Sequence, residues 1–296
     1  MIPRIIHQSW KVEQVPDRWL AFQQSWRRNH PDYEYRFWTD DANRAFVGQF
    51  FPEFLAVYDG YRHPVSRADL ARYLVVCHFG GIYADLDCES LKPLDDLLTG
   101  HELVFGLEPP SHVKRPAVAS RGFARVVCNA LFASVPCHPF WEHLFPLLVA
   151  SKDESNVLEC AGPFALTRAC DSYSCLQDIT ILPSDVFYPL DSYLRPATGR
   201  GDTEGPYTVH HWSGSWWRDA VINSGYSEQL NVTGGFAPYV FSLFAGQLPP
   251  GLALQREGTL SGTPNVAGTF NFTVAVTDVR NNAGAKACSL RVLGPV

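Results

Sequence analysis

Two aspartates that stand two residues apart offer the clearest chemistry in this chain. Asp85 and Asp87 follow a short apolar run, residues 82–84, that has the composition of a strand. Side chains alternate along a strand, so both carboxylates should point the same way and repel each other. A divalent cation explains such a pair, because Mg²⁺ and Mn²⁺ prefer oxygen ligands and are commonly shared between carboxylates and phosphate oxygens. The spacing therefore predicts a metal site that binds a diphosphate.

An isolated Asp-x-Asp motif is also compatible with two different arrangements. The two carboxylates can lie in a solvated turn, where they face water and cap the next segment. They can also be the acid pair of a glycoside hydrolase, whose carboxylates flank the scissile bond at a separation of about 5 to 9 Å. Such a pair usually comes from two different elements, so neighbours on one strand favour chelation over hydrolysis.

A helix is expected immediately before the metal strand. Ser66 and Asp69 have the spacing of a Ser-x-x-Asp helix start, and the glycine pair that follows Phe79 is typical of a helix end. Asp69 and Arg72 are three residues apart and therefore share a face of this helix. They form either part of the site or a surface ion pair of little energetic value.

A second motif with metal-binding potential lies near residue 210. Residues 207–217 read YTVHHWSGSWW, which predicts a strand that ends on His210 and His211 and runs into a Ser/Gly/Trp segment. Neutral imidazole can complete the shell of a metal ion, and serine hydroxyls and backbone amides bind phosphate. A single histidine would more often be a buried core residue.

The order of the other predicted elements is that of an α/β domain. A strand at 2–8, a helix at 16–29 and a strand at 33–38 suggest a βαβ unit. Further helices are expected at 39–49, 52–58, 92–98, 138–150 and 164–169, and further strands at 103–106 and 179–182. The proline-rich segment 108–122 is predicted to be a loop, which either closes over the site or lies passively on the surface.

Residues 67–87 resemble the signature of glycosyltransferase family 32, the sugar transferases with an Asp-x-Asp motif. The matching residues are Arg67, Ala68, Asp69, Arg72, Tyr73, Gly80, Gly81, Tyr83, Asp85 and Asp87. The opening IPRIIHQSW and the segment YTVHHWSGSWW resemble the first and last motifs of the same family. The resemblance covers about residues 2–217. This family includes yeast-type initiating mannosyltransferases and the mannosyltransferases of inositol phosphoceramide.

The resemblance implies a fold, a reaction and a cofactor. The fold is a nucleotide-binding, Rossmann-like α/β sheet of the GT-A type with flanking helices. The reaction moves a hexose of the mannose, galactose or glucose type from a UDP- or GDP-sugar to a glycan or glycolipid acceptor, with retention of anomeric configuration. The cofactor is Mn²⁺ or Mg²⁺.

It also implies roles for individual residues. Asp87 binds the metal, Asp85 binds the metal or the ribose, and His211 completes the shell, with His210 as the neighbouring alternative. Asp69 and Arg72 position ribose and donor sugar, and with the two motif aspartates they form the catalytic set. Donor or nucleotide contacts are implied for His7, Gln8, Trp10, Tyr83, Asn129, Gly162, Pro163, Ser215 and Trp216. His7 and Trp10 can equally be core or rim residues, and Asn129 can be a structural cap.

A second domain is predicted after residue 224. Residues 225–296 are rich in Gly, Pro and Thr, and short alternating segments are separated by turn signals. This pattern predicts a small all-β sandwich, and its strings resemble bacterial immunoglobulin-like repeats. It contains no catalytic constellation, so it is expected to be an interaction module or a spacer. Residues 1–224 are then the transferase domain.

Composition excludes some functions and favours a compartment. A formal charge of −6 without a Lys/Arg run argues against a nucleic-acid partner. No uncharged apolar stretch of about 18 residues predicts a membrane span, and the first residues lack a signal-peptide layout. Eight cysteines without a Cys-x-x-Cys motif predict free thiols in a reducing compartment. We therefore expect a cytoplasmic protein, with peripheral membrane contact left open.

Two rival functions fit the same residues. One is a non-catalytic glycan-binding scaffold built on a degenerate transferase domain, although both motif aspartates and the histidines are present. The other is a toxin-like enzyme that glycosylates a protein, because large clostridial glucosylating toxins carry a related string. Identification of the acceptor would separate the second from a glycan or glycolipid transferase.

Overall fold

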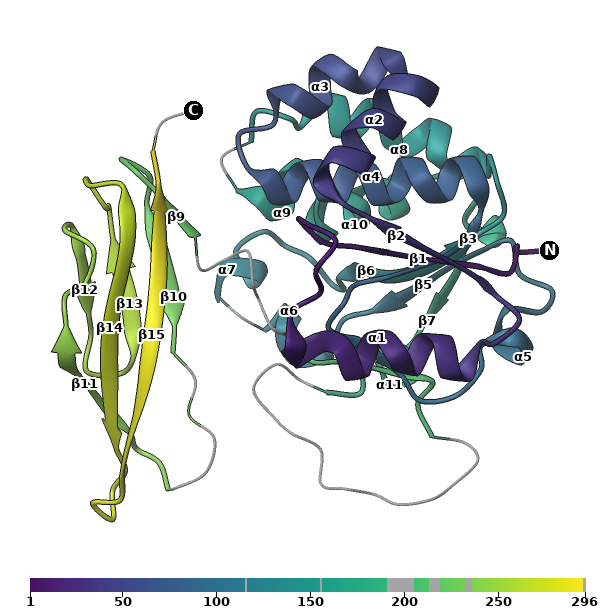
Figure 1. The fold of residues 1–296 in the computed structure, drawn as a ribbon. Coiled ribbons are helices and arrows are strands. Elements are labelled where there is room, and N and C mark those ends of the chain that lie inside the picture. Colours follow the sequence, from purple (N-terminus) through teal and green to yellow (C-terminus); the bar gives the residue numbers. More distant parts are fainter. Residues whose placement is uncertain are drawn as a thin grey trace. The chain divides into compact units, whose positions relative to one another are not determined.

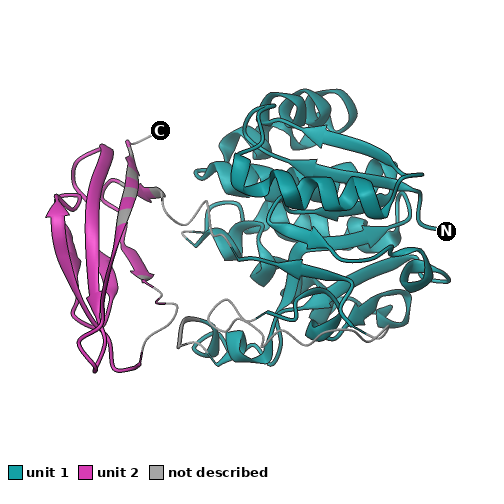
Figure 2. Cartoon of the chain, turned by 60° about the horizontal axis from the view of Figure 1, so that its bottom comes forward, with its two compact units in different colours: residues 1–212 teal, residues 213–296 magenta. Residues whose placement is uncertain are grey.

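The computed structural model describes residues 1–114, 116–154, 156–190, 205–212, 219–230, 232 and 236–294. The chain divides into two compact units, residues 1–212 and residues 213–296 (Figure 2). This division lies before the boundary predicted after residue 224. The reason is that strand β9 (Asp219–Val221) pairs with the last strand of the second unit, β15 (Ala283–Leu293).

The first unit is built around a mixed six-stranded sheet (Figure 1). Its strand order is β2-β1-β3-β6-β5-β7, in which β1 is parallel to β2 and β3, and β6 is antiparallel to β3 and β5. The strands are β1 (Ile5–Ser9), β2 (Glu34–Trp38), β3 (Gly81–Ala84), β5 (Leu103–Leu107), β6 (Val127–Ser134) and β7 (Thr180–Leu182). A separate two-stranded ribbon pairs β4 (Cys88–Ser90) with β8 (Thr208–His210).

Helices cover both faces of the sheet. Four of them, α2, α3, α4 and α8, lie on one face, whereas α1 and α11 lie on the other (Figure 1). The longer helices are α1 (Asp17–Asn29), α2 (Asp40–Phe50), α4 (Pro64–Phe79), α8 (Pro139–Ala150) and α10 (Pro163–Ser172). The short ones are η1 (Pro52–Phe54), α3 (Leu55–Gly60), α5 (Asp95–Leu98), α6 (Pro110–Val113), α7 (Pro116–Ala119), α9 (Val157–Cys160), η2 (Leu176–Asp178) and α11 (Ser184–Phe187).

Alternation along the strands builds two cores. Tyr83, Phe105 and Phe132 face the cluster formed with α2, α4 and α8. Their neighbours Ile82, Val104 and Leu131 face the cluster formed with α1 and α11, as the two-residue period of a strand requires. Both faces of the central strands are covered by apolar clusters, so the polar residues lie where these strands end.

Two of the sequence expectations for this unit were wrong. Helix α4 begins at Pro64, not at Ser66, and the side chain of its N-cap residue His63 makes no capping bond. Proline at the first helical position supplies the start, and Ser66 and Asp69 are buried inside the helix instead of capping it. The predicted loop at 108–122 contains the two short helices α6 and α7, each of which also begins with proline.

The second unit is a pair of antiparallel-rich sheets around its own core. One sheet has the order β10-β13-β12 and the other β11-β14-β15-β9. The remaining strands are β10 (Tyr226–Gln229), β11 (Val240–Gly246), β12 (Leu252–Leu254), β13 (Thr259–Gly262) and β14 (Gly268–Thr277). Phe241, Leu260, Phe272 and Leu290 bring both sheets into one apolar cluster. The predicted all-β sandwich is therefore confirmed.

None of the helices in the described part of the chain has the length and apolar character that a membrane crossing needs.

Candidate active site

The Asp-x-Asp motif forms the turn between β3 and β4. The backbone leaves β3 after Ala84, and Cys88 N–H donates to the carbonyl of Asp85 at 2.9 Å, which closes a tight turn. Leu86, between the two aspartates, is buried in an apolar cluster with Val15 and Trp19. The buried side chain of Leu86 therefore holds the motif in a turn, and the strand does not continue through the two aspartates. The two carboxylates have different partners.

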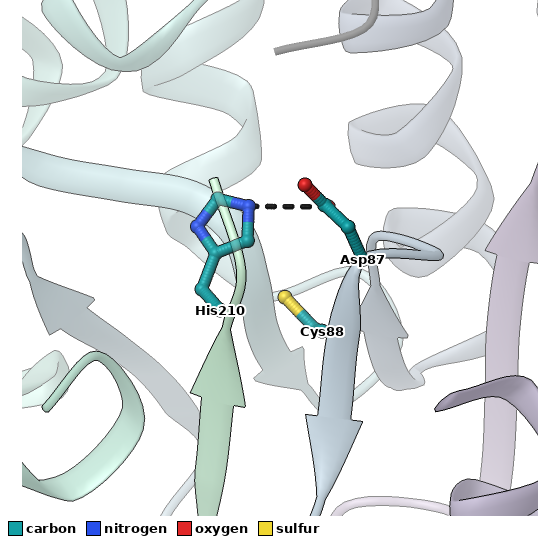
Figure 3. A group of neighbouring side chains, drawn as sticks. All are labelled: Asp87, Cys88 and His210. Atoms are coloured by element: carbon teal, nitrogen blue, oxygen red, sulfur yellow. Dashed lines mark hydrogen bonds and ion pairs between the residues drawn. The ribbon is translucent and has the colours of Figure 1, made fainter. Parts of the chain in front are cut away.

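Asp87 is joined to His210. Cys88 and His210 are opposite each other in the β4–β8 ribbon, so their side chains lie on the same face of it. The Nε2 atom of His210 lies 3.2 Å from Oδ1 of Asp87 (Figure 3). Burial lowers the pKa of His210, but the negative charges of Asp87 and Asp85 outweigh burial and raise it above its ordinary value.

The structure brings His210, and not the predicted ligand His211, to Asp87. His211 Nε2 lies 3.0 Å from the carboxylate of Glu89, and its ring stacks on Phe22 of α1 with centroids 4.1 Å apart. Only the backbone of His211 reaches Asp87, through an N–H bond of 2.9 Å to its carbonyl. Asp87 and His211 both lie just outside the ribbon, whose last pair is Cys88 and His210, so strand alternation does not determine which histidine side chain meets Asp87.

Within the described residues, Asp87, Cys88 and His210 form a group whose candidate ligand atoms all lie within 4.8 Å of one another (Figure 3). A carboxylate suits Mn²⁺, whereas imidazole is a softer ligand that more often binds Zn, Cu, Fe or Ni. Burial raises the pKa of the Cys88 thiol well above its ordinary value, and the thiol donates to the carbonyl of Ala130 at 3.8 Å. The carboxylate of Asp87 and the imidazole of His210 therefore offer one oxygen and one nitrogen ligand to a divalent transition-metal ion, whereas Cys88 stays a protonated core thiol.

Asp85 belongs to a buried network centred on Arg72. The Arg72 guanidinium lies 3.1 Å from Asp69 Oδ1 and 3.1 Å from Asp85 Oδ1, and it donates to the carbonyl of Asn129 at 2.9 Å. Asn129 Nδ2 in turn donates to Asp69 Oδ1 at 2.9 Å. The Nε atom of Arg72 is buried and has no hydrogen-bond partner in the structure. The predicted pair of Asp69 and Arg72 is thus a buried part of the site, not a surface ion pair.

Burial sets the electrostatics of this network. It raises the pKa of Asp69 to about 7, although the Arg72 guanidinium acts in the opposite direction. It also raises the pKa of Asp85, and the nearby charge of Asp87 adds to that effect. Asp69 and Arg72 are almost fully buried, whereas the Asp85 side chain is 28% exposed, so water reaches only the Asp85 edge of the network.

The end of β1 fixes the position of Asp85. Gln8 Nε2 donates to the Asp85 carbonyl at 3.2 Å, and its Oε1 accepts from Tyr35 at 2.7 Å. The Tyr83 hydroxyl donates to Asp85 Oδ1 at 3.0 Å and lies 2.9 Å from the hydroxyl of Ser9. Sequence reasoning missed Ser9, although its place directly after the predicted strand, beside Gln8, was a signal for it.

His7 is a core residue. It is fully buried, its Nδ1 accepts from Trp38 Nε1 at 3.1 Å, and its Nε2 lies 2.9 Å from the carbonyl of Gly80. Because Nδ1 is the acceptor, the proton is on Nε2 and both ring nitrogens are used inside the protein. Burial lowers the pKa of His7 to about 4, so the ring is neutral. This arrangement corresponds to the core alternative for His7 and leaves no ring nitrogen for a nucleotide.

The other predicted donor residues are spread around this site. Trp10 packs edge-on against Trp19 at the rim of the cluster that contains Leu86. Gly162 is the N-cap residue of α10 and Pro163 is its first residue. A Cβ atom on Gly162 would lie 2.9 Å from Leu158 Cα, which explains glycine there. The predicted residues Ser215 and Trp216 lie outside the described residues.

Comparison with known proteins shows that two parts of the chain match known protein families. Residues 16–104 match the family described as "Glycosyltransferase sugar-binding region containing DXD motif", and residues 219–293 match the one described as "Putative Ig domain". Inositol phosphoceramide mannosyltransferase 2 of Schizosaccharomyces pombe is 41% identical over 178 residues, which cover 58% of this chain and 47% of that protein. An uncharacterized glycosyltransferase of Acanthamoeba polyphaga mimivirus is 29% identical over 215 residues, which cover 70% of this chain and 78% of that protein.

A solved structure of the PaToxG glycosyltransferase is also similar, with a TM-score of 0.42 and 20% identity over 57% of this chain and 69% of that one. The chain spans less than half the length of the first mannosyltransferase relatives that it matches. The family matches confirm the resemblance and the immunoglobulin-like domain predicted from the sequence. This chain therefore carries the glycosyltransferase sugar-binding region that contains the DXD motif, joined to an Ig-like domain, and its relatives include mannosyltransferases.

Proposed function

We propose that the first unit is a metal-dependent, retaining glycosyltransferase. It moves a hexose, of the mannose, galactose or glucose type, from a UDP- or GDP-sugar to a glycan or glycolipid acceptor. The observation that carries this proposal is the contact between Asp87 and His210 beside the buried Asp69–Arg72–Asp85 network. In a chain with a DXD sugar-binding region, that arrangement supports a cation site next to a sugar site.

In this proposal Asp87 and His210 hold Mn²⁺ or Mg²⁺, and Asp85 contributes to the metal or to the ribose. When bound, the cation supplies positive charge that stabilises the departing nucleoside diphosphate. His210 must give up its proton to become a ligand, since only neutral imidazole binds a metal. Its raised pKa therefore makes metal affinity depend on pH.

Arg72 is the residue proposed to orient the donor sugar. Asp69, Asp85 and the Asn129 carbonyl hold its guanidinium in place, so its direction is fixed before a ligand arrives. A buried N–H without a partner costs about 1 to 3 kcal/mol, and the Nε atom of Arg72 is such a group. A hydroxyl or phosphate oxygen of the donor would satisfy it. None of the described residues of this network has the character of an activated nucleophile, which agrees with attack on the same face as the departing diphosphate.

The compartment is part of the proposal. All eight cysteines are free thiols, as expected in a reducing environment that also supplies nucleotide sugars. We therefore retain the cytoplasm as the proposed location, and the second unit as an interaction module or spacer.

A panel of UDP- and GDP-sugars tests the function. Donor hydrolysis and thermal shift would be measured with Mn²⁺ and then with EDTA, for the unmodified chain and for Asp87→Asn. We expect one donor to be hydrolysed and to raise Tm only with metal, and Asp87→Asn to lose both effects. If no donor binds with or without metal, the transferase proposal fails and the non-catalytic scaffold replaces it.

A further inference from the structure

Two cysteines that are distant in sequence meet where α4 ends and the chain leaves β6. Cys77 lies in the last turn of α4, and Cys137 lies in the turn between β6 and α8. The N–H of Cys137 donates to the carbonyl of Cys77 at 2.7 Å, which joins the two backbones directly. Disulfides span Cα separations of about 4.4 to 6.8 Å, a range compatible with two residues joined by a backbone hydrogen bond. This close contact places the pair within bridging range.

The backbone of Cys137 is also unusual. Its φ is 53°, in the left-handed region that glycine adopts without cost and that other residues rarely enter. A cysteine there carries a conformational cost that glycine would avoid. Strained backbone residues are commonly found at functional sites, and this one is a cysteine that lies beside Cys77.

Exposure separates this pair from the other cysteines. Cys137 is exposed, so a small oxidant can reach its thiol, whereas Cys77 is buried behind it. Cys88 and Cys128 also lie close enough to interact, but both are buried, so oxidants cannot reach them. Cys175 is partly exposed, and its thiol lies 3.7 Å from the hydroxyl of Ser174.

We propose that Cys77 and Cys137 are a modification site, at which glutathione disulfide forms a reversible intramolecular disulfide. The Cys137 thiolate attacks one sulfur of glutathione disulfide and releases one glutathione. The Cys77 thiolate then attacks Sγ of Cys137 and releases the second glutathione, which takes the proton of Cys77. Two protein thiols are oxidised and one glutathione disulfide is reduced to two glutathione molecules.

The bridge stabilises the first unit and leaves the active site accessible. It closes the loop from residue 77 to residue 137, which contains β3, β4, β5 and β6, and so constrains the unfolded chain. Cys77 precedes β3, whereas Asp85 follows it, so the bridge and the site lie at opposite ends of this strand. Burial raises the pKa of Cys77 to about 12, so the second step is slow and the mixed disulfide accumulates first.

Oxidation with glutathione disulfide, followed by thiol blocking, digestion and mass spectrometry, tests this proposal. Cys137→Gly is the matched variant, because glycine fits the left-handed backbone and the protein should fold. Cys175→Ser is the control for general thiol oxidation. We expect a peptide pair linked through residues 77 and 137 in the unmodified chain and in Cys175→Ser, but not in Cys137→Gly.

Thermal unfolding gives the second readout. The oxidised, unmodified chain should unfold a few degrees higher than the reduced chain, and dithiothreitol should reverse the change. Cys137→Gly should unfold at the same temperature with and without the oxidant. A stable mixed disulfide of Cys137 with glutathione, with Cys77 still reduced after long incubation, would overturn the proposal, as would unchanged thiols at both positions.

Discussion

The imidazole of His210, the last residue of β8, lies 3.2 Å from the carboxylate of Asp87, the residue directly before β4, whereas the side chain of the next residue, His211, pairs with Glu89. One histidine of an adjacent pair is therefore available to a cation beside the DXD motif. The other joins the ribbon to α1 through Phe22. The two histidines can be separated by experiment because their side chains share no partner in these contacts.

Removal of the proposed metal ligands should weaken Mn²⁺ binding. We expect His210→Ala and Asp87→Asn to lower the affinity for Mn²⁺ by at least about 100-fold, because loss of outer-shell partners alone costs about 10- to 100-fold. His211→Ala should change it only a few-fold. Calorimetric titration without any donor measures this directly. An equal loss in His211→Ala and His210→Ala would place the cation elsewhere.

Replacement of Arg72 by lysine should damage both stability and donor binding. An ammonium group cannot contact Asp69, Asp85 and the Asn129 carbonyl together as the planar guanidinium does. Breaking a buried ion pair costs about 3 to 5 kcal/mol, so we expect Arg72→Lys to lower the free energy of unfolding by about 3 kcal/mol.

Arg44→Lys is the control for this change. Arg44 forms an exposed ion pair with Asp59, so its replacement should have little effect on urea unfolding. If Arg72→Lys were as stable as Arg44→Lys and still bound donor, the buried network would determine neither stability nor donor binding.

Gly81 should tolerate no side chain. A Cβ atom there would lie 2.5 Å from the Ile5 carbonyl oxygen, and its φ is +97°. Gly100 has a φ of +83° but nothing within 4 Å of the Cβ position, so it provides the matched control for backbone strain alone. We expect Gly100→Ala to cost about 1 kcal/mol and Gly81→Ala several times that value. Equal losses in thermal unfolding would mean that the β1–β3 contact can relax.

His7 should make folding sensitive to acid. Its pKa is about 4 in the folded protein and 6.5 in the unfolded chain, so the unfolded chain binds more protons between these values. The free energy of unfolding is therefore not reduced by protonation of His7 above about pH 6.5, and it decreases as the pH falls below that value. The loss reaches about 3 kcal/mol near pH 4, at 1.36 kcal/mol per pKa unit.

Urea unfolding at several pH values, with His7→Phe for comparison, measures this contribution. The variant should be less stable at neutral pH, because the Trp38 N–H and the Gly80 carbonyl lose their partner. However, its stability should fall less steeply with acid. Parallel curves for the two proteins would show that His7 is not the group responsible.

Periodic patterns predicted most of the first unit. The helices near 16–29 and 39–49 and the strands near 33–38 and 103–106 form close to the expected residues, because apolar alternation and glycine or proline signals are local. The start of α4 was misplaced, because Asp69 resembles a capping residue in sequence. Its actual partners, Arg72 and Asn129, include one that comes from a distant strand.

The sequence predicted that the motif residues group together, but not every contact that they make. The aspartates of the motif, Asp69 and Arg72 are found beside one another, as a sequence string shared by a family can indicate. The choice between His210 and His211 depends on the path of the chain just outside the β4–β8 ribbon, and the role of Ser9 depends on the contact of β1 with β3. Neither pairing is encoded within one short segment, so no local pattern could predict it.

The parallel pairing of β9 with β15 gives the second unit a mechanical property. These strands lie near the two ends of the unit, and they run in the same direction with Asp219 opposite Arg291 and Val221 opposite Leu293. A pull that separates the beginning of β9 from the end of β15 would slide the strands past each other and load their hydrogen bonds simultaneously. Bonds loaded in this way resist more force than bonds that open one after another. The Ig-like unit is therefore suited to bear tension along the chain, which single-molecule stretching would measure.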